Sequence, residues 1–172
     1  MDAHGQSTQA LLELVGQGAE YAAVHAQATV RCRAGPLSFT VVSNSSALCE
    51  KLTRCLLPGG DGANLTIALL SGSEPPFAPP PAWNLPHTDS RHVERLHVAP
   101  DGKLIALYNP DFHLWMILDH TRHLALMWIG DEAQIPFWEE GAPFKIILNW
   151  FLSSTNMFMV HGGVVGDGEQ GC

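Results

Sequence analysis

The stretch that decides the fold is residues 95–129, RLHVAPDGKLIALYNPDFHLWMILDHTRHLALMWI. Apolar and aromatic runs alternate here with short segments of Pro, Asp, Asn, Gly and other polar residues, the pattern of strands joined by tight turns. The turn signals are Pro100-Asp101-Gly102, Asn109-Pro110-Asp111 and Asp119-His120-Thr121-Arg122. The predicted strands are 95–99, 103–108, 113–118 and 123–129. The stretch therefore predicts an antiparallel meander.

A helix is predicted directly after the meander. Its apolar positions recur at helical spacing, and the residue before them suits a first turn. These residues are Phe144, Ile147, Leu148 and Phe151, preceded by Pro143. Ile146 and Trp150 make the helix apolar nearly all round, so we expect it to be buried between layers. The run Met157 to Val160 then predicts a central strand.

The first part of the chain reads as β-α-β with a plausible core. Residues 1–26 are loosely helical, and the β-branched and aromatic run 38–42 predicts a strand. The next helix has one apolar face, a cap before it and a stop after it. The apolar face consists of Leu48, Leu52, Cys55 and Leu56. Ser43 and Asn44 can cap the start of the helix, and Pro58-Gly59-Gly60 ends it. With a buried strand at 65–70, the fold class is α+β.

The segment between the two parts is rich in proline. Residues 74–86 hold six of the twelve prolines, which excludes a helix or a central strand. We therefore divide the chain into an N-terminal α/β part (1–73), a Pro-rich linker (74–90) and a meander-plus-helix part (91–172). A proline stretch can also be a ligand for aromatic grooves. The linker interpretation is favoured because Phe77 and Trp83 can pack locally.

Composition excludes several classes of function. Lys and Arg number 9 against 17 Asp and Glu, a net charge of −8, which argues against nonspecific binding to nucleic acid or an anionic membrane. Only 15% of residues are charged, so part of the surface is expected to meet a partner. There is no secretory signal and no run of 18 apolar residues. Together with four cysteines that form no CxxC pair, this predicts a cytoplasmic protein with reduced thiols.

Two groups of residues are weak candidates for chemistry. His113, His120 and His123 are close in sequence, but one falls in a turn and the other two at opposite strand positions of a hairpin. Ordinary surface histidines are therefore favoured over a metal site. Glu139 and Glu140 precede the predicted helix, where carboxylates suit the positive end of its dipole. A structural role is favoured over acid/base work, and no metal or cofactor ligand is assigned within the chain.

The last residues are the most informative. A buried strand runs into His161-Gly162-Gly163, where missing side chains allow close approach of backbone or ligand. Val164-Val165 reads as a second short strand, and Asp167-Gly168 as a hairpin turn. The pattern stops where a returning strand is expected. We therefore expect the chain to be a fragment of a longer protein.

This segment resembles HPr kinase/phosphorylase-like proteins. The run His161-Gly162-Gly163-Val164-Val165, with the Asp-Gly turn and Gly171, looks like the segment just before their phosphate-binding loop. The preceding helix and strand, 147–151 and 157–160, are similar to the smaller HPr-kinase-related proteins that accompany PqqD-like chaperones. The resemblance covers about residues 143–172. It implies the start of a PEP-carboxykinase-like, P-loop kinase core, whose GxxxxGK[ST] loop is absent here.

Two functions from different classes follow. The resemblance implies the N-terminal portion of an ATP-dependent kinase that phosphorylates a serine of a protein or peptide, with ATP and Mg²⁺ bound by the full-length parent and none by this chain. His161 then matches the family's active-site histidine, although it could also simply end a core strand. The parent's kinase core would be a partner, and the family allows a homo-oligomer. The alternative is a non-catalytic module that binds a peptide or protein through its meander.

Overall fold

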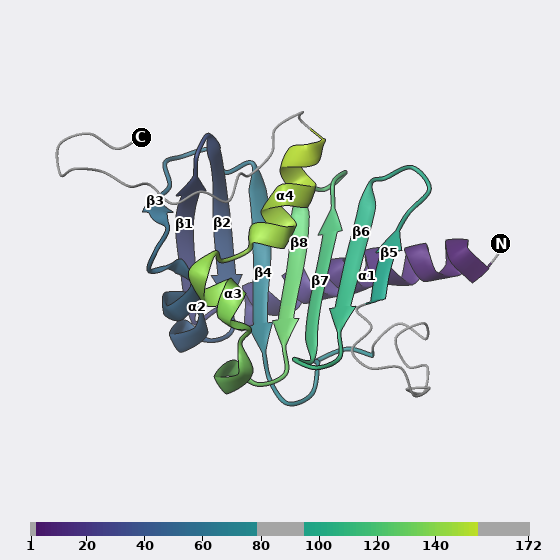
Figure 1. Cartoon of the computed structure of the whole chain (residues 1–172), viewed down its shortest axis with the longest axis horizontal. Coiled ribbons are helices and arrows are strands. Elements are labelled where there is room, and N and C mark those ends of the chain that lie inside the picture. Colours follow the sequence, from purple (N-terminus) through teal and green to yellow (C-terminus); the bar gives the residue numbers. More distant parts are fainter. Residues whose placement is uncertain (1–2, 79–94, 155–172) are drawn as a thin grey trace.

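The computed structural model describes residues 3–78 and 95–154, and these form one mixed eight-stranded sheet with helices on both faces (Figure 1). The strands lie in the order β3-β1-β2-β4-β8-β7-β6-β5. Their bounds are β1 Ala28–Ala34, β2 Leu37–Ser43, β3 Leu57–Pro58, β4 Leu65–Ser71, β5 Arg95–Val98, β6 Leu104–Asn109, β7 Leu114–Asp119 and β8 Leu124–Ile129. The helices are α1 Ala3–Val24, α2 Ser46–Thr53, the 3₁₀ helix η2 Glu132–Gln134, α3 Phe137–Gly141 and α4 Lys145–Ser153. The fold is α+β.

The two predicted sequence parts meet in the middle of this sheet. β2 and β4 pair in parallel around helix α2, which confirms the β-α-β prediction. β5, β6, β7 and β8 pair antiparallel in sequence order, which confirms the meander. β4 then pairs in parallel with β8, with Thr66 opposite Leu124 and Ser71 opposite Ile129. One sheet therefore runs through residues from both sides of the proline-rich segment.

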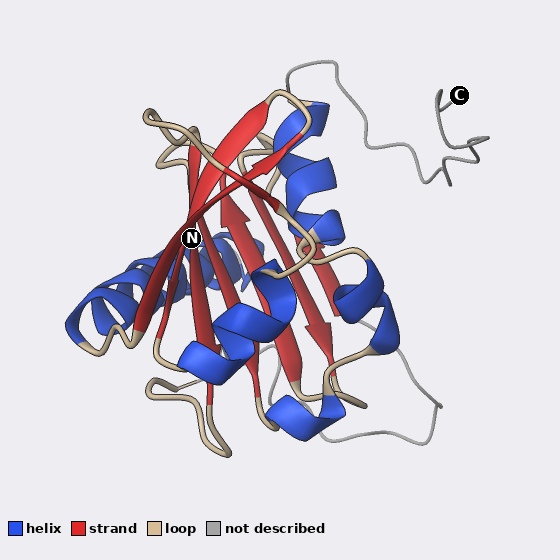
Figure 2. Cartoon of the chain, turned by 90° about the vertical axis from the view of Figure 1, so that its left-hand side faces the viewer, coloured by secondary structure: helices blue, strands red, loops and turns tan. Residues whose placement is uncertain are grey.

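The sheet separates two apolar cores, and Figure 2 shows helices on its two sides. α1 packs on one face, where Leu11, Leu14 and Val15 meet Trp115 and Trp128 of the meander. α2 and α4 pack on the other face around a larger cluster. Phe39 of β2 and Phe144, just before α4, are fully buried there with their rings edge to face at 6.1 Å. Strands buried on both faces explain the nearly continuous apolar sequence of β7 and β8.

The helix α4 was predicted at almost its observed position. It packs on the sheet and contacts β7, as expected for residues 144–152. Within the described residues the sheet covers one side of α4 and no second layer covers its other side, so the expected enclosure between two layers stays a prediction. Ile147 and Leu148 are buried, whereas Ile146 and Trp150 are only half-buried. The predicted strand at 157–160 lies outside the described residues.

Four further elements were not predicted, namely β1, the two-residue strand β3, the 3₁₀ helix η2 and α3. β1 pairs with β2 across the two-residue turn Gly35-Pro36, in which Gly35 has φ +59°, a value that favours glycine. The short helix α3 lies between the meander and α4. Helix α2 begins as the sequence suggested, but its cap is one residue later than predicted. The Ser45 side chain, rather than that of Ser43 or Asn44, accepts a hydrogen bond from the Leu48 N–H at 3.2 Å.

Helix α1 approaches the sheet most closely at Gly18. A Cβ atom added there would lie 2.7 Å from Cδ1 of Leu126, a fully buried side chain of β8. We expect Gly18→Val to lower the free energy of unfolding by about 1–3 kcal/mol, because overpacking outweighs the gain in helix propensity. Gln17→Val is the matched control, since Gln17 is exposed at the next position. Equal urea denaturation midpoints for the two variants would contradict this close approach.

Candidate functional site

The turn between β7 and β8 is organised by one buried carboxylate. Asp119 is 2% exposed, and its Oδ1 accepts hydrogen bonds from the backbone N–H groups of Thr121 and Arg122 at 2.8 and 3.1 Å. Its Oδ2 accepts from Nε of Arg122 at 2.5 Å. Both carboxylate oxygens are therefore satisfied within a four-residue turn, which makes this turn well defined.

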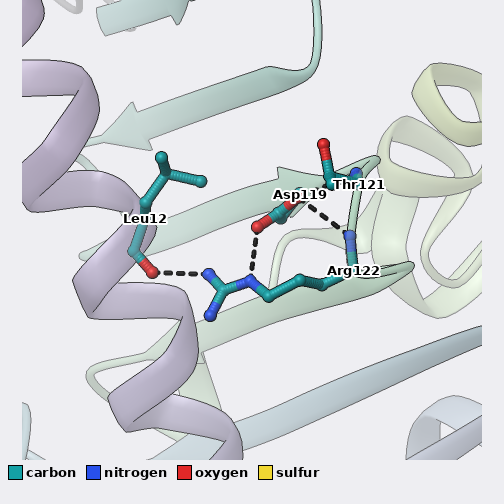
Figure 3. A network of polar contacts seen from close by, with 4 residues as sticks. All are labelled: Leu12, Asp119, Thr121 and Arg122. Atoms are coloured by element: carbon teal, nitrogen blue, oxygen red, sulfur yellow. Dashed lines mark hydrogen bonds and ion pairs between the residues drawn. The ribbon is translucent and has the colours of Figure 1, made fainter.

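The same turn holds helix α1 against the sheet, as Figure 3 shows. Nη2 of Arg122 donates a hydrogen bond to the backbone carbonyl of Leu12 at 2.6 Å. The Arg122 side chain is 44% exposed, so its ion pair with Asp119 is partly screened by water. A shallow cavity of about 420 Å³ lies beside this contact, lined by residues of α1 and of the turn. The network is structural, because both Asp119 oxygens and the Nε and Nη2 atoms of Arg122 have partners from the chain.

The other side of the turn carries two histidines that pack on helix α4. The ring of His120 stacks on Phe151 with 6.0 Å between centroids and 7° between planes. The ring of His123 meets Phe151 edge to face at 5.3 Å. Burial lowers the pKa of His120, and the neighbouring His123 lowers it further against the opposing effect of Asp119. Burial and this neighbour therefore favour the neutral form of His120.

A cavity opens next to these histidines, at the C-terminal end of α4. Its volume is about 330 Å³, within the range of small-molecule sites. Its described lining is an apolar floor with three polar groups at the rim: Pro36, Leu37, Phe151, Leu152, Asn64, His123 and Ser154. None of these described residues is a carboxylate, a lysine or an arginine. The cavity can therefore offer hydrogen bonds from an imidazole, an amide and a hydroxyl, but no fixed charge.

The most perturbed carboxyl group lies elsewhere, in the short helix α3 just before α4. Glu139 is fully buried, and its Oε2 accepts a hydrogen bond from the backbone N–H of Phe144 at 2.9 Å. Its Oε1 has no hydrogen-bond partner. Burial raises the pKa of Glu139 to about 7, against the smaller opposing effect of the Phe144 hydrogen bond. The adjacent Glu140 pairs with Lys51 of α2 at 2.8 Å, so the two carboxylates of α3 contact different elements, Glu139 the start of α4 and Glu140 the helix α2.

The histidines considered as metal ligands form no common site among the described residues. His161, the predicted catalytic residue, lies outside the described residues. His113 and His123 both have positive φ, 43° and 51°, and lie at opposite ends of the β7–β8 hairpin. No group of three or more potential metal ligands occurs in the described ranges 3–78 and 95–154. Cys32 and Cys49 are buried thiols whose pKa values burial raises, and Cys55 is exposed.

In the described part of the proline-rich segment, Phe77 packs on the sheet. The ring of Phe77 lies 6.2 Å from that of Trp115 in β7. A groove of about 290 Å³ runs between Pro76, Phe77 and the end of α1. Trp83 lies outside the described residues. None of the described helices is both long and apolar enough to cross a membrane.

The site that sequence reasoning missed is the cavity beside His123. Its lining comes from four separate segments: the β1–β2 turn, the approach to β4, the β7–β8 turn and α4. The only local signal was the pair of histidines around a turn. In comparisons with protein-family models, curated proteins and solved structures, none was found that matches the chain.

Proposed function

We propose that this chain is the N-terminal portion of an HPr-kinase-like enzyme that phosphorylates a serine of a protein or peptide with ATP. The observation that carries the proposal is the sequence His161-Gly162-Gly163-Val164-Val165 with its Asp-Gly turn, which follows α4. In the family this pattern precedes the phosphate-binding loop. The chain contributes the sheet and helices, and the nucleotide is bound by the parent protein.

The position of α4 is compatible with this proposal. Ser154, just after the helix, lines the cavity that also contains His123 and Asn64. The segment with His161 follows Ser154 in the sequence. A cavity with hydrogen-bonding groups and no fixed charge suits the part of a kinase that borders the phosphate site, while the positive charges that hold phosphates come from the phosphate-binding loop.

The proposed reaction is a transfer of the γ-phosphoryl group of ATP. A bond forms between the serine oxygen and the γ-phosphorus, while the bond from that phosphorus to the β,γ-bridging oxygen breaks and ADP leaves. The serine proton passes to a base, which the family resemblance assigns to an aspartate of the parent core. His161 is assigned a place close to the transferred group. Mg²⁺ offsets the charge of the phosphates.

The full-length protein tests this proposal. We expect its gene to encode a GxxxxGK[ST] motif after Cys172. The protein is incubated with Mg-ATP and a library of serine peptides, and tandem mass spectrometry detects phosphoserine. Phosphoserine that depends on Mg²⁺ and ATP supports the proposal. A parent sequence without the motif, or a protein that forms no phosphoserine, contradicts it.

The 172-residue chain is expected not to bind ATP on its own. The only Gly-Lys pair of the sequence, Gly102-Lys103, lies in the β5–β6 turn, and no GxxxxGK[ST] loop is present to surround the β- and γ-phosphates. Isothermal titration with Mg-ATP should therefore give no micromolar binding. Micromolar affinity would mean that the chain contains a nucleotide site of a different kind.

The second candidate function is a module that binds an extended peptide through the meander. One observation favours it: the meander ends in an edge strand, β5, whose Leu96 and Val98 are exposed apolar side chains. Edge strands of this kind can pair with a further strand. This module would be non-catalytic, and a parent sequence without a GxxxxGK[ST] motif would favour it over the kinase.

A further inference from the structure

Strand β5 has a hydrogen-bonding edge that points away from the sheet. It pairs with β6 on one side, and no described strand pairs with its other side. The Ala99 N–H donates to the Leu104 carbonyl at 2.9 Å, which fixes the alternation of the ladder. The backbone N–H and C=O groups of His97 therefore point toward β6. The N–H and C=O groups of Leu96 and Val98 point outward, as they do on every second residue of an edge strand.

The side chains of these two residues extend an apolar face of the sheet. Leu96 is opposite Leu107 in β6, which in turn is opposite Met116 in β7. Leu107 and Met116 belong to the core under α4, and Leu96 continues the row with 62% of its surface exposed. Val98, opposite Ile105, is 44% exposed. The edge therefore offers both backbone groups and apolar side chains at alternate positions.

Helix α1 supports β5 on one face of the sheet. β5 also differs in length and composition from β3, the strand at the other edge of the sheet. The Nε2 atom of His97 lies 3.0 Å from the Thr8 hydroxyl of α1, so the helix supports β5 on the opposite face. At the far edge, β3 has only two residues, and one of them is Pro58. A short strand with proline is a usual protection against pairing. The described residues of β5 carry no such protection.

We propose that β5 binds an extended segment of a partner protein or peptide, which adds to the sheet as a further antiparallel or parallel strand. An extended backbone matches the spacing of the alternating outward groups of Leu96 and Val98 and replaces the water that otherwise bonds them. The segment has apolar side chains at alternate positions to cover these two residues. Because this chain carries a net charge of −8, a neutral or basic segment is favoured over a second copy, which would repel it. The inference rests on the second candidate function, which it narrows to one strand edge and one partner chemistry, and it does not depend on whether phosphoryl transfer occurs.

The probe is an acetylated and amidated peptide, Lys-Thr-Val-Thr-Ile-Thr-Lys. Its matched control carries N-methyl groups on the backbone of Val and Ile, which removes two donors and keeps the side chains. Amide hydrogen exchange is followed by NMR with and without each peptide. We expect the Leu96 and Val98 amides to exchange fast in the free protein and to become protected with the probe. The amides of His97 and Ala99 are expected to be protected throughout.

Two protein variants and a matched control locate the binding. Val98→Pro removes one outward N–H without removing a bond to β6, and Leu96→Lys places a charge on the apolar edge. Each is expected to weaken probe binding by about tenfold. Leu57→Lys makes the same change on the other edge strand, where Leu57 is 56% exposed, and is expected to leave binding unchanged. Circular dichroism checks that each variant is folded.

The outcomes are distinct. Protection of Leu96 and Val98 by the probe but not by its N-methylated control supports the proposal. Protection of these amides in the free protein at every concentration means that the chain covers its own edge, which overturns it. Protection that rises with protein concentration means that a second copy binds there, which also overturns it. An exchange pattern that does not change with millimolar probe also overturns the proposal. None of these measurements depends on kinase activity.

Discussion

The stability of this chain is expected to fall as the pH rises from about 4 to 8, because Glu139 is buried. The pKa of this carboxyl group is about 7 in the folded protein, above the ordinary value of 4.5, since burial disfavours its charged form. Below pH 4.5 the group is protonated in both the folded and the unfolded state, and folding carries no penalty. Above that pH the unfolded state loses the proton first, so the free energy of unfolding decreases until the folded group also ionises, and the total loss is on the order of 3 kcal/mol.

The variant Glu139→Gln tests this expectation without a large change in shape. Glutamine cannot ionise, and its carbonyl can still accept the Phe144 hydrogen bond. The difference in unfolding free energy between variant and parent should therefore shift in favour of the variant by about 3 kcal/mol between about pH 4 and pH 8. This shift does not depend on the constant cost of burying an amide. Urea denaturation at several pH values measures it.

Glu140→Gln is the matched control at the next position. Glu140 pairs with Lys51, and its hydrogen bond with Lys51 holds its pKa below the ordinary value. Its contribution to stability is therefore present at neutral pH and lost as the pH falls, which is the opposite direction. A flat difference for Glu139→Gln, or the same trend in both variants, would show that Glu139 is not the group responsible.

The second large effect is expected at His161 in the full-length protein. If His161 lies beside the transferred phosphoryl group, His161→Ala should lower phosphoryl transfer by roughly 100- to 10,000-fold, the usual effect of losing a positioned proton-transfer group. The loss of stability should stay near the typical value for one substitution, about 1 kcal/mol. Turnover and melting temperature are measured on the same preparation.

The two roles of His161 predict opposite results. A variant with full activity and a lower melting temperature would make His161 a structural residue at the end of a strand. A matched control is His113→Ala at another histidine, on the exposed β6–β7 turn. It is expected to leave turnover unchanged.

The local elements of this fold could be predicted because their signals are contained in short segments. Turn residues mark the hairpins, and helical spacing marks α2 and α4. β1 was missed although it also alternates, with Thr29, Arg31 and Arg33 exposed between more buried neighbours. Its two arginines made the segment look polar. Neither the pairing of β4 with β8 nor the side of the sheet on which α4 packs has a local signal, because both depend on which elements pack together.

Less of the candidate site than of the fold could be predicted from the sequence. The hairpins containing Asn109 and Asp119 have related turns, in which the side-chain oxygen accepts from two backbone N–H groups and a histidine follows with positive φ. Asn and Asp are typical of such turns, so this much is readable in the sequence. That His120 and His123 lie against Phe151 depends on the packing of α4, a contact between distant segments.

The pairing of β4 with β8 also sets the order in which the protein can fold during synthesis. β4 has buried side chains on both faces and lies between β2 and β8, yet β8 is translated more than fifty residues later. Until residues 124–129 leave the ribosome, one side of β4 is an apolar strand edge without its partner. Such edges pair readily with other chains. Nascent chains that stall between β4 and β8 are therefore the species most prone to aggregate and most in need of a chaperone.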